Sequence, residues 1–521
     1  MKKILGLLLP VILIGVLAGC ATAKDEGANA DSQSVGIAIT GDAHADALDA
    51  TSYDSEMAIY SAVYEPLVTY GEKGEYQPGL AESWDISEDG KTYTFHLQEG
   101  VKFSDGSDFD AEAVKFTIER AQKMNPTTTL QTLLYLDNVE VVDSTTVTMH
   151  FNKVANQVLA ELCATRPLRI MSPNAVEDGQ VDGSFQEAIG TGPFTVGTST
   201  DEEVTMVPNP YYNHENPLTY QVVFKTITDG SSRALALRSG EVDIAGGTLG
   251  QIMDSDQQSL ADSDDFATYQ FTGTMSHFLA FNPDNTTLTS EIRRGIELAI
   301  DKESLSDHDM KGLFQSSVQY VTDENQTTIP YDVGQAKQTF EAAGYQMNDD
   351  GFYEKDGQVL AFDLVIQTAE FPEWKEQAEV IENNLKQVGV NLTINTLDSE
   401  SYYDVLWTSK DFDMILYRTY TDALLPYNFL NSLFYNTADS HGVLADDERL
   451  STLLDTYAAA STEADQQSIF DDIFKELSDE TLAIPIDYKD ENFVTTSKIE
   501  DFVFSGLSDA PIDYQQLVVK Q

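Results

Sequence analysis

The sequence predicts an α/β fold, and two observations support this prediction. Strand-like alternation and helix-like spacing follow one another from residue 35 onward, with no long heptad run and no internal repeat. With 41% apolar and 22% charged residues, the composition is that of a folded globular protein. Mixed order of this kind predicts sheets covered by helices on both faces. A chain of 521 residues is long enough for about three folding units or two large ones.

The first half contains a clear strand followed by a helix. Residues 92–97 alternate between apolar and polar side chains, which predicts a half-buried strand bounded by Asp-Gly turns at 89–90 and 105–106. Asp110 then precedes apolar residues at helical spacing and is expected to cap that helix. The run GTGP at 190–193 predicts a rigid turn where the main chain passes close to another segment.

The second half continues the mixed pattern. Ser290 is expected to cap a helix, and a later helical stripe ends at Gly344. A strand at 360–367, a helix at 374–387 and a strand at 390–397 follow in sequence. This order predicts two parallel strands joined by a right-handed crossover.

Charge excludes several classes of function. There are 30 Lys and Arg against 87 Asp and Glu, so the formal net charge is −57. A protein this acidic cannot replace the counterions of nucleic acid, and charge alone would not attract it to an anionic membrane. The expected role of the charge is to keep an exported protein soluble.

The N-terminus predicts export and lipid anchoring. A basic start, an apolar run at 4–17 and the segment LAGC at 17–20 form a signal peptide over 1–19 that resembles a bacterial lipobox. Cys20 would then become the lipidated first residue of the mature protein, and 20–34 would be a flexible tether. The expected location is extracytoplasmic, anchored to the bacterial cell membrane.

The sequence lacks the familiar motifs of an enzyme. It has no Gly-rich phosphate loop, no Gly-x-Ser-x-Gly elbow and no His-x-x-x-His or His-Glu-x-x-His pair among its seven histidines. Cys163 is the second of two cysteines, so after lipidation of Cys20 it is expected to be a free core residue. The prediction is a protein that is not an enzyme.

Several segments together resemble the peptide/nickel-binding family of extracytoplasmic solute-binding lipoproteins, which serve ATP-driven importers. The segments are YEPL at 64–67, LAESW at 80–84, SEDGKTYTF at 87–95, GVKFSDG at 100–106, GTGPF at 190–194 and AIPI at 483–486. The resemblance covers essentially the whole mature chain. It implies a monomeric protein that works with an ABC permease and an ATPase, holds no permanent cofactor and binds no nucleic acid.

The resemblance implies a two-lobed, periplasmic-binding-protein-like α/β fold with a ligand cleft between the lobes and a two-segment hinge. The expected hinge crossings lie near 281–283 and 487–488. An extra subdomain would be inserted into the first lobe. The expected boundaries are 35–66, 187–280 and 497–521 for the first lobe, 67–186 for the inserted subdomain and 281–496 for the second lobe.

Two motifs resemble nickel-binding members, whose cargo is nickel held by a small organic chelator. In the segment TRPLRIMSP at 165–173, Arg166 corresponds to an arginine that grips a chelator carboxylate, and the fork of a guanidinium suits that task. A structural ion pair is the alternative for Arg166, and Arg169 is expected to be structural. In the segment YRTY at 417–420, Tyr420 corresponds to an aromatic residue that packs against the chelate. Met57 and Tyr403 are carried over as weaker matches.

The metal itself would be reached by His441, from the loop that brings a histidine to nickel in those members. Neutral imidazole is a good nickel ligand, and an exposed loop histidine with no role is the alternative. The family's second chelator arginine is replaced by threonines at 127–129, which implies a chelator with fewer carboxylates.

Two other functions remain open. Peptide-binding members hold the peptide's α-amino group with an aspartate four residues before a proline, and Asp422 stands four residues before Pro426. The arginine segment favours a nickel chelate over a peptide. An anchored receptor or an extracytoplasmic enzyme is the third class, although the abundant carboxylates single out no catalytic pair.

Overall fold

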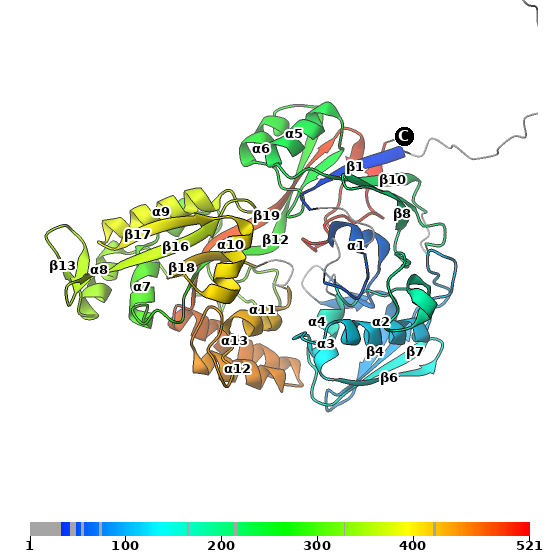
Figure 1. The fold of residues 1–521 in the computed structure, drawn as a ribbon, viewed down its shortest axis with the longest axis horizontal. Helices are drawn as coiled ribbons and strands as arrows, with labels where there is room; N and C mark the ends of the chain where they lie inside the picture. Colours follow the sequence, from blue (N-terminus) through cyan, green and yellow to red (C-terminus); the bar gives the residue numbers. More distant parts are fainter. Residues whose placement is uncertain are drawn as a thin grey trace, which may run out of the picture. The chain divides into compact units, whose positions relative to one another are not determined.

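The computed structural model describes residues 33–41, 48–53, 57–71, 75–163, 166–212, 217–327, 329–419 and 424–520. A ten-stranded mixed sheet runs through them (Figure 1). Its strands, in spatial order, are β17 (Asn391–Leu397), β16 (Ala361–Gln367), β18 (Met414–Arg418), β12 (Phe266–Phe281), β19 (Ala483–Thr496), β11 (Ile244–Gly246), β1 (Gln33–Ile39), β10 (Tyr220–Thr226), β9 (Glu203–Pro208) and β8 (Phe194–Ser199).

A separate small-sheet subdomain is built between β1 and β8 of the large sheet. Its four-stranded antiparallel sheet has the order β4 (Ala81–Ile86), β5 (Thr92–Leu97), β7 (Thr146–Phe151) and β6 (Leu136–Asp143). The hairpin β2 (Val68–Tyr70) and β3 (Tyr76–Pro78) precedes it, and its helices are α2 (Ala111–Met124), α3 (Gln131–Leu134) and α4 (Val158–Cys163). We use "small-sheet subdomain" for residues 68–163.

The other helices belong to the two parts of the large sheet. Those before β12 are α1 (Met57–Val63), α5 (Gly230–Ser239) and α6 (Asp254–Ala261). Those after β12 are α7 (Ser290–Ala299), α8 (Val333–Ala342), α9 (Trp374–Gln387), α10 (Ser399–Asp404), α11 (Pro426–Phe434), α12 (Glu448–Ala458) and α13 (Glu463–Asp479). Short strands complete the list: β13 (Gln346–Met347), β14 (Tyr353–Lys355), β15 (Gln358–Val359), β20 (Ile499–Asp501) and β21 (Val518–Val519).

Two large hydrophobic cores divide the chain into two lobes. One core runs from Val35 through the small-sheet subdomain to Ile244 and resumes at Phe493 near the C-terminus. The other is formed entirely by residues between Met275 and Ile486. We call the residues around these two cores the first and the second lobe. The predicted two-lobed α/β fold is therefore present, whereas the predicted sequence boundaries remain predictions.

The lobes are joined by β12 and β19, which pair along most of their length (Figure 1). The register of this pair shifts between Thr272 and Ser276, opposite Tyr488–Asp490. Gly273 permits the close approach there, because a Cβ on it would lie 2.4 Å from the Lys489 carbonyl oxygen. From His277 onward β12 also pairs with β18 of the second lobe. This shift lies before the expected crossing at 281–283 on β12 and next to the expected one at 487–488 on β19, and both expected crossings remain predictions.

Most of the predicted elements appear. In β5 the burial alternates as expected, and Asp110 caps α2 by accepting a hydrogen bond from the Ala113 amide. β16, α9 and β17 form the predicted unit with parallel strands. The cap of α7 is Thr289 rather than Ser290, because the Thr289 side chain accepts from the Ile292 amide.

The turn at 190–193 passes close to another segment, as predicted. A Cβ on Gly190 would lie 2.0 Å from the Val63 carbonyl oxygen, and one on Gly192 would lie 2.6 Å from the same atom. The Gly192 amide donates to that oxygen at 2.9 Å. The glycines therefore fasten the end of α1, which carries candidate site residues, to the start of β8.

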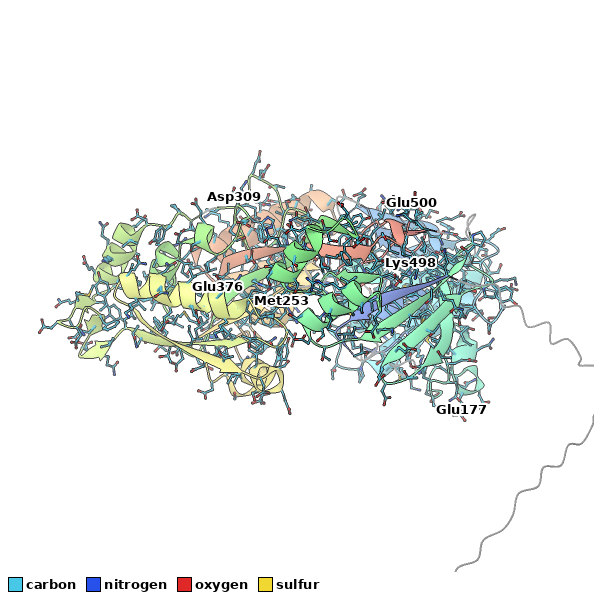
Figure 2. The ribbon with its side chains drawn as sticks, turned by 90° about the horizontal axis from the view of Figure 1, so that it is seen from above. Glu177, Met253, Asp309, Glu376, Lys498 and Glu500 are labelled. Atoms are coloured by element: carbon cyan, nitrogen blue, oxygen red, sulfur yellow. The ribbon has the colours of Figure 1, made fainter. Side chains whose placement is uncertain are left out.

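The acidic side chains lie largely at the surface. Figure 2 shows Glu177, Asp309, Glu376 and Glu500 at the outside of the ribbon, and all four are exposed. None of the helices in the described ranges has the length and apolar run that crossing a bilayer requires.

Candidate ligand-binding site

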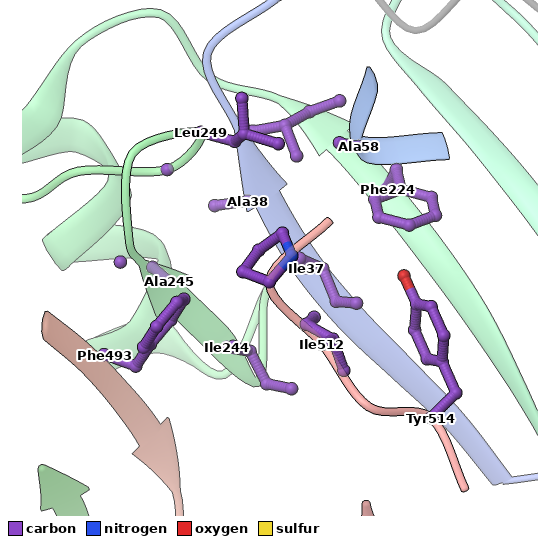
Figure 3. Close-up of a pocket in the computed structure, with 14 residues that line it drawn as sticks. Ile37, Ala38, Ala58, Phe224, Ile244, Ala245, Leu249, Phe493, Ile512 and Tyr514 are labelled. Atoms are coloured by element: carbon purple, nitrogen blue, oxygen red, sulfur yellow. The ribbon is translucent and has the colours of Figure 1, made fainter. Parts of the chain in front are cut away.

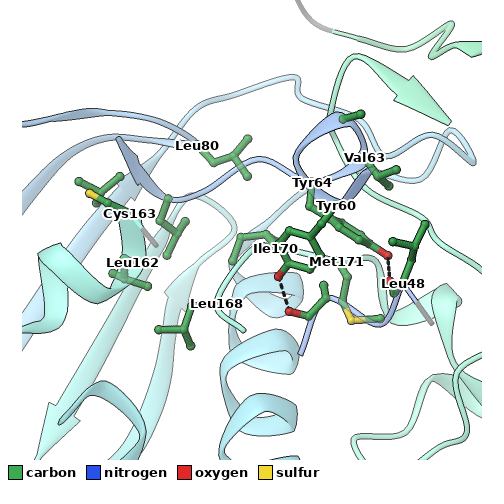
Figure 4. Packing of buried hydrophobic residues seen from close by; sticks show 14 of the residues in the cluster. Leu48, Tyr60, Val63, Tyr64, Leu80, Leu162, Cys163, Leu168, Ile170 and Met171 are labelled. Atoms are coloured by element: carbon green, nitrogen blue, oxygen red, sulfur yellow. Dashed lines mark hydrogen bonds between the residues drawn. The ribbon is translucent and has the colours of Figure 1, made fainter. Parts of the chain in front are cut away.

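The segment that carries Arg166 is anchored in the first core. Arg166 is half-buried and follows α4 by three residues. Leu168 and Ile170, farther along the segment, are fully buried, and Figure 4 shows them in the same cluster as Tyr60 and Tyr64 of α1. Since the neighbouring side chains are packed, the backbone that bears the Arg166 guanidinium is held in place.

The charge of Arg166 acts on two tyrosines from the start of the chain. Desolvation raises the pKa of both Tyr53 and Tyr60, and the positive charge of Arg166 acts in the opposite direction on each. Tyr53 Oη lies 3.5 Å from Thr128 Oγ1, in the threonine run that replaces the family's second arginine. Met57 is half-buried and opens α1, one turn before Tyr60. Arg166, Tyr53 and Met57 all belong to segments of the first lobe.

Arg169 and Cys163 have structural surroundings. Arg169 is buried and donates from Nη1 to the Tyr64 carbonyl oxygen at 3.1 Å, and burial lowers the pKa of its guanidinium. Cys163 is buried in the first core, where burial raises the pKa of its thiol. Both residues therefore agree with their predicted structural roles.

On the second lobe, Arg418 and Tyr403 lie side by side. Arg418 ends β18, and its Cζ lies 5.0 Å from the centroid of the Tyr417 ring. Its Nη2 approaches Tyr403 Oη at 3.5 Å, and Tyr403 Oη donates to Glu370 Oε2 at 3.1 Å. Tyr403 is therefore next to the second motif, beside a cation and a carboxylate.

Tyr420 and Asp422 lie outside the described residues. Their flanks are well defined on both sides. Thr419 Oγ1 donates to the Thr274 carbonyl oxygen at 3.1 Å, at the shift in the hinge strand. The Leu424 carbonyl oxygen accepts from Tyr70 Oη of the small-sheet subdomain at 3.4 Å. The described residues on the two sides of this gap therefore contact the hinge strand and the first lobe, respectively.

Hydrogen bonds between residues that flank the two motifs form one line of contact between the lobes, which we call the interlobe seam. Tyr70 Oη also donates to the Ala160 carbonyl oxygen of α4 at 3.1 Å. One residue later, Glu161 Oε1 accepts from Asn428 Nδ2 of α11 at 2.8 Å. Arg166 follows α4 on one side of the seam, and the motif at 417–423 precedes α11 on the other.

A buried histidine stands at the hinge behind this seam. His277 pairs with Arg418 in the strand register, and its Nδ1 accepts from Trp374 Nε1 at 3.1 Å. Burial lowers the pKa of His277 well below its usual value, and the charges of Lys489 and Arg418 act in the same direction. His277 is therefore neutral, with its proton on Nε2.

His441 lies at the other end of β18. Its Nε2 is 2.9 Å from Asp284 Oδ1, and Asp284 follows the last residue of β12. In the register, that end of β12 pairs with Met414, four residues from Arg418, which is roughly 13 Å of strand. The metal-ligand role of His441 remains a prediction, and this position does not favour it.

The described residues contain no group of three or more His, Cys, Asp or Glu side chains that could hold a metal ion. An apolar cavity lies in the first lobe between β1, β11 and the C-terminal segment near Ile512 and Tyr514 (Figure 3). Its volume of about 20 Å³ is close to that of a single water molecule. This cavity is too small for a peptide or a chelate.

Comparison with known proteins adds the family. Residues 75–441 match the model of the bacterial extracellular solute-binding proteins, family 5. The chain belongs to this family. It is 27% identical to the nickel-binding periplasmic protein of Escherichia coli (strain K12) over 482 residues, which cover 89% of this chain and 90% of that protein. It is also 27% identical to di/tripeptide-binding protein 1 of Pseudomonas aeruginosa (strain UCBPP-PA14), over 68% of this chain and 70% of that protein.

A solved structure of the same family is similar over nearly the whole chain. NikA from Brucella suis in complex with Fe(III)-EDTA superposes with a TM-score of 0.84 at 27% identity, covering 93% of this chain and all of that one. The predicted family and fold class are therefore confirmed.

Two features of this family 5 chain were not predicted as parts of the site. The first is Arg418, which lies in the YRTY motif. Its positive charge in so acidic a chain could have indicated a ligand-binding role. The second is the hydrogen-bonded pair Glu161–Asn428. No sequence pattern indicates this pair, because its members are 267 residues apart in the sequence.

Proposed function

We propose that this chain is the extracytoplasmic solute-binding lipoprotein of an ATP-driven importer, and that it captures nickel as a small organic chelate at the interlobe seam. Its relatives are solute-binding proteins for transport, so the chain is proposed to have no enzymatic activity. Nickel would be cargo rather than a resident cofactor. The protein would act as a monomer that delivers its ligand to a permease driven by an ATPase.

The observation that carries this proposal is the position of Arg166. It is half-buried on a segment packed into the first core and follows α4, whose Glu161 contacts the second lobe; the chain has only 30 Lys and Arg residues against 87 acidic ones. A guanidinium can grip a chelator carboxylate through two parallel hydrogen bonds, most strongly when the lobes exclude water. Met57, Tyr403 and Tyr420 are proposed to supply the apolar and aromatic contacts to the chelate.

The similarity to nickel proteins supports this ligand. The relative named as nickel-binding is 27% identical over 89% of this chain, whereas a relative named as a probable D,D-dipeptide-binding protein is 23% identical over 94%. The chelator would supply most of the metal's donor atoms, so the proposal does not depend on His441.

A peptide is the second candidate ligand, because the family also contains di/tripeptide-binding proteins. In that case Asp422, four residues before Pro426, would hold the peptide's α-amino group. The main ionic contact to the ligand would therefore come from Arg166 for a chelate and from Asp422 for a peptide.

Isothermal titration with nickel–L-histidine and with a pool of short peptides tests the two candidates. Arg166→Ala should weaken chelate binding by about 2–5 kcal/mol, whereas Asp422→Ala and His441→Ala should bind like the wild type. Arg238→Ala, at a surface ion pair on α5, is the matched control. Loss of binding in Asp422→Ala alone, with the peptide pool as the ligand, would replace the nickel proposal by the peptide one.

We also propose that Cys20 is the lipid anchor, as the segment LAGC at 17–20 suggests. Residues 1–32 lie outside the described ones. Metabolic labelling with a fatty acid should mark the wild type and not Cys20→Ser, and equal labelling of both would refute the anchor.

A further inference from the structure

The small-sheet subdomain contacts the second lobe through a row of polar side chains that are not among the proposed ligand-binding residues. Asn156 Nδ2 donates to the carbonyl oxygens of Tyr457 at 2.6 Å and Ala460 at 3.2 Å, both at the end of α12. Gln157 Nε2 donates to Tyr457 Oη at 2.7 Å. Three independent hydrogen bonds thus tie the start of α4 to the second lobe.

Glu161 supplies the strongest contact in this row. Its side chain is completely buried, and its oxygens accept from the amides of Gln131 at 2.9 Å and Thr132 at 2.7 Å. These two donors belong to its own subdomain. The third donor, Asn428 Nδ2 at 2.8 Å, comes from the second lobe, so opening of the lobes would remove it. Hydrogen bonds to a charged group are stronger than neutral ones.

The titratable groups around Glu161 are tyrosines. Its charge acts on residues of both lobes: Tyr53, Tyr70, Tyr93, Tyr135 and Tyr427. Burial raises the pKa of Glu161, and the hydrogen bonds from Thr132, Asn428 and Gln131 oppose this rise. Any additional negative charge at this point would therefore be repelled by a poorly solvated carboxylate.

The row is adjacent in sequence to both proposed binding motifs. Glu161 precedes Arg166 by five residues, and Asn428 follows Asp422 by six. A contact that joins these two short segments also determines how far apart the proposed ligand-binding groups lie. Glu161 and Asn428 would therefore act as positioning residues, which set the places of the ligand-binding groups without touching the ligand.

We infer that Asn156, Gln157 and Glu161 form a latch with Asn428 and Tyr457 that favours the closed arrangement of the lobes and thereby positions Arg166 relative to the second lobe. The inference rests on the proposed function only in placing a ligand at the interlobe seam. The latch shifts the balance of the lobes toward the closed arrangement, so that less of the ligand's binding energy is spent on closure.

Small-angle scattering of the ligand-free protein tests the latch directly. Asn428→Ala removes the hydrogen bond to Glu161, and Asn428→Asp places a second carboxylate against it. Both should raise the radius of gyration at pH 7 relative to the wild type. Two carboxylates in contact share one proton, so Asn428→Asp alone should become compact again as the pH is lowered toward about 5. Asn383→Ala, an exposed asparagine on α9, is the control and should not change the radius.

Titration with nickel–L-histidine then tests positioning. Asn428→Ala should bind about tenfold more weakly than the wild type, with the thermal midpoint of unfolding and the far-UV circular dichroism unchanged. The latch is refuted if both Asn428 variants keep the wild-type radius without ligand. The positioning role is refuted if Asn428→Ala opens but keeps the wild-type affinity. If the wild type does not bind the chelate, the proposed ligand is wrong. The radii of gyration measured without ligand still test the latch in that case.

Discussion

Single residues show how an acidic chain can still offer cations to a ligand. Arg166 and Arg418 come from opposite lobes. The charge of Arg166 acts on Tyr53 and Tyr60, and Arg418 contacts Tyr403 and Tyr417. Aromatic neighbours shield a guanidinium from water without neutralising its charge. Such surroundings favour an anionic group such as the carboxylate of a chelator.

His441 was assigned to the metal by sequence resemblance, and that role remains a prediction. The motif placed it near the metal, but residue order cannot tell to which end of a strand a loop returns. In the structure its Nε2 contacts Asp284 at 2.9 Å, beyond the end of β12 that is remote from Arg418.

The pKa of His441 is raised, first by its hydrogen bond to the Gly442 carbonyl oxygen and also by Asp284. A raised pKa in the folded state stabilises the protein below the unfolded value, and this stabilisation is lost as the pH rises through the folded value. His441→Ala should therefore lower the thermal midpoint at pH 5.5 and leave it nearly unchanged at pH 8.5. Thermal melts of the wild type and the variant at both values measure this. An equal effect at the two pH values would contradict the ion pair.

At the scale of elements, local patterns predicted most of the structure. The alternation in β5, the Asp110 cap of α2 and the β16–α9–β17 unit depend on neighbours in the sequence, and all three are present. The cap of α7 was displaced by one residue because Thr289 and Ser290 are both good capping residues. Contacts between elements were not predictable in this way, since Glu161 meets Asn428 only after both lobes have formed.

The turn that fastens α1 to β8 gives an element-scale prediction. A Cβ at Gly190 would meet the Val63 backbone at 2.0 Å, and backbone cannot turn aside as a side chain can. Gly190→Ala should therefore lower the free energy of unfolding by about 1–3 kcal/mol. Gly230→Ala is the matched control, because the nearest atom to its Cβ would be at 3.4 Å. Urea unfolding of the two variants measures the difference, and equal stabilities would show that the close approach is unimportant.

At the scale of the whole molecule, two cores are joined by two paired strands. The first core excludes residues 275–486 and the second is built from them, so the lobes can move as separate packed bodies. The flexible point is the register shift between Thr272 and Ser276, where pairing is interrupted. Hinge closure around a ligand is the motion that such a two-strand connection allows.

The central claim is that this molecule closes on a nickel chelate gripped by Arg166. Native mass spectrometry of the protein purified from its host tests it most directly. The account predicts an adduct with the isotope pattern of nickel plus the mass of a small carboxylic acid, which Arg166→Ala should lose and Arg238→Ala should keep. A ladder of peptide masses on the wild type, or an adduct that Arg166→Ala retains in full, would contradict it.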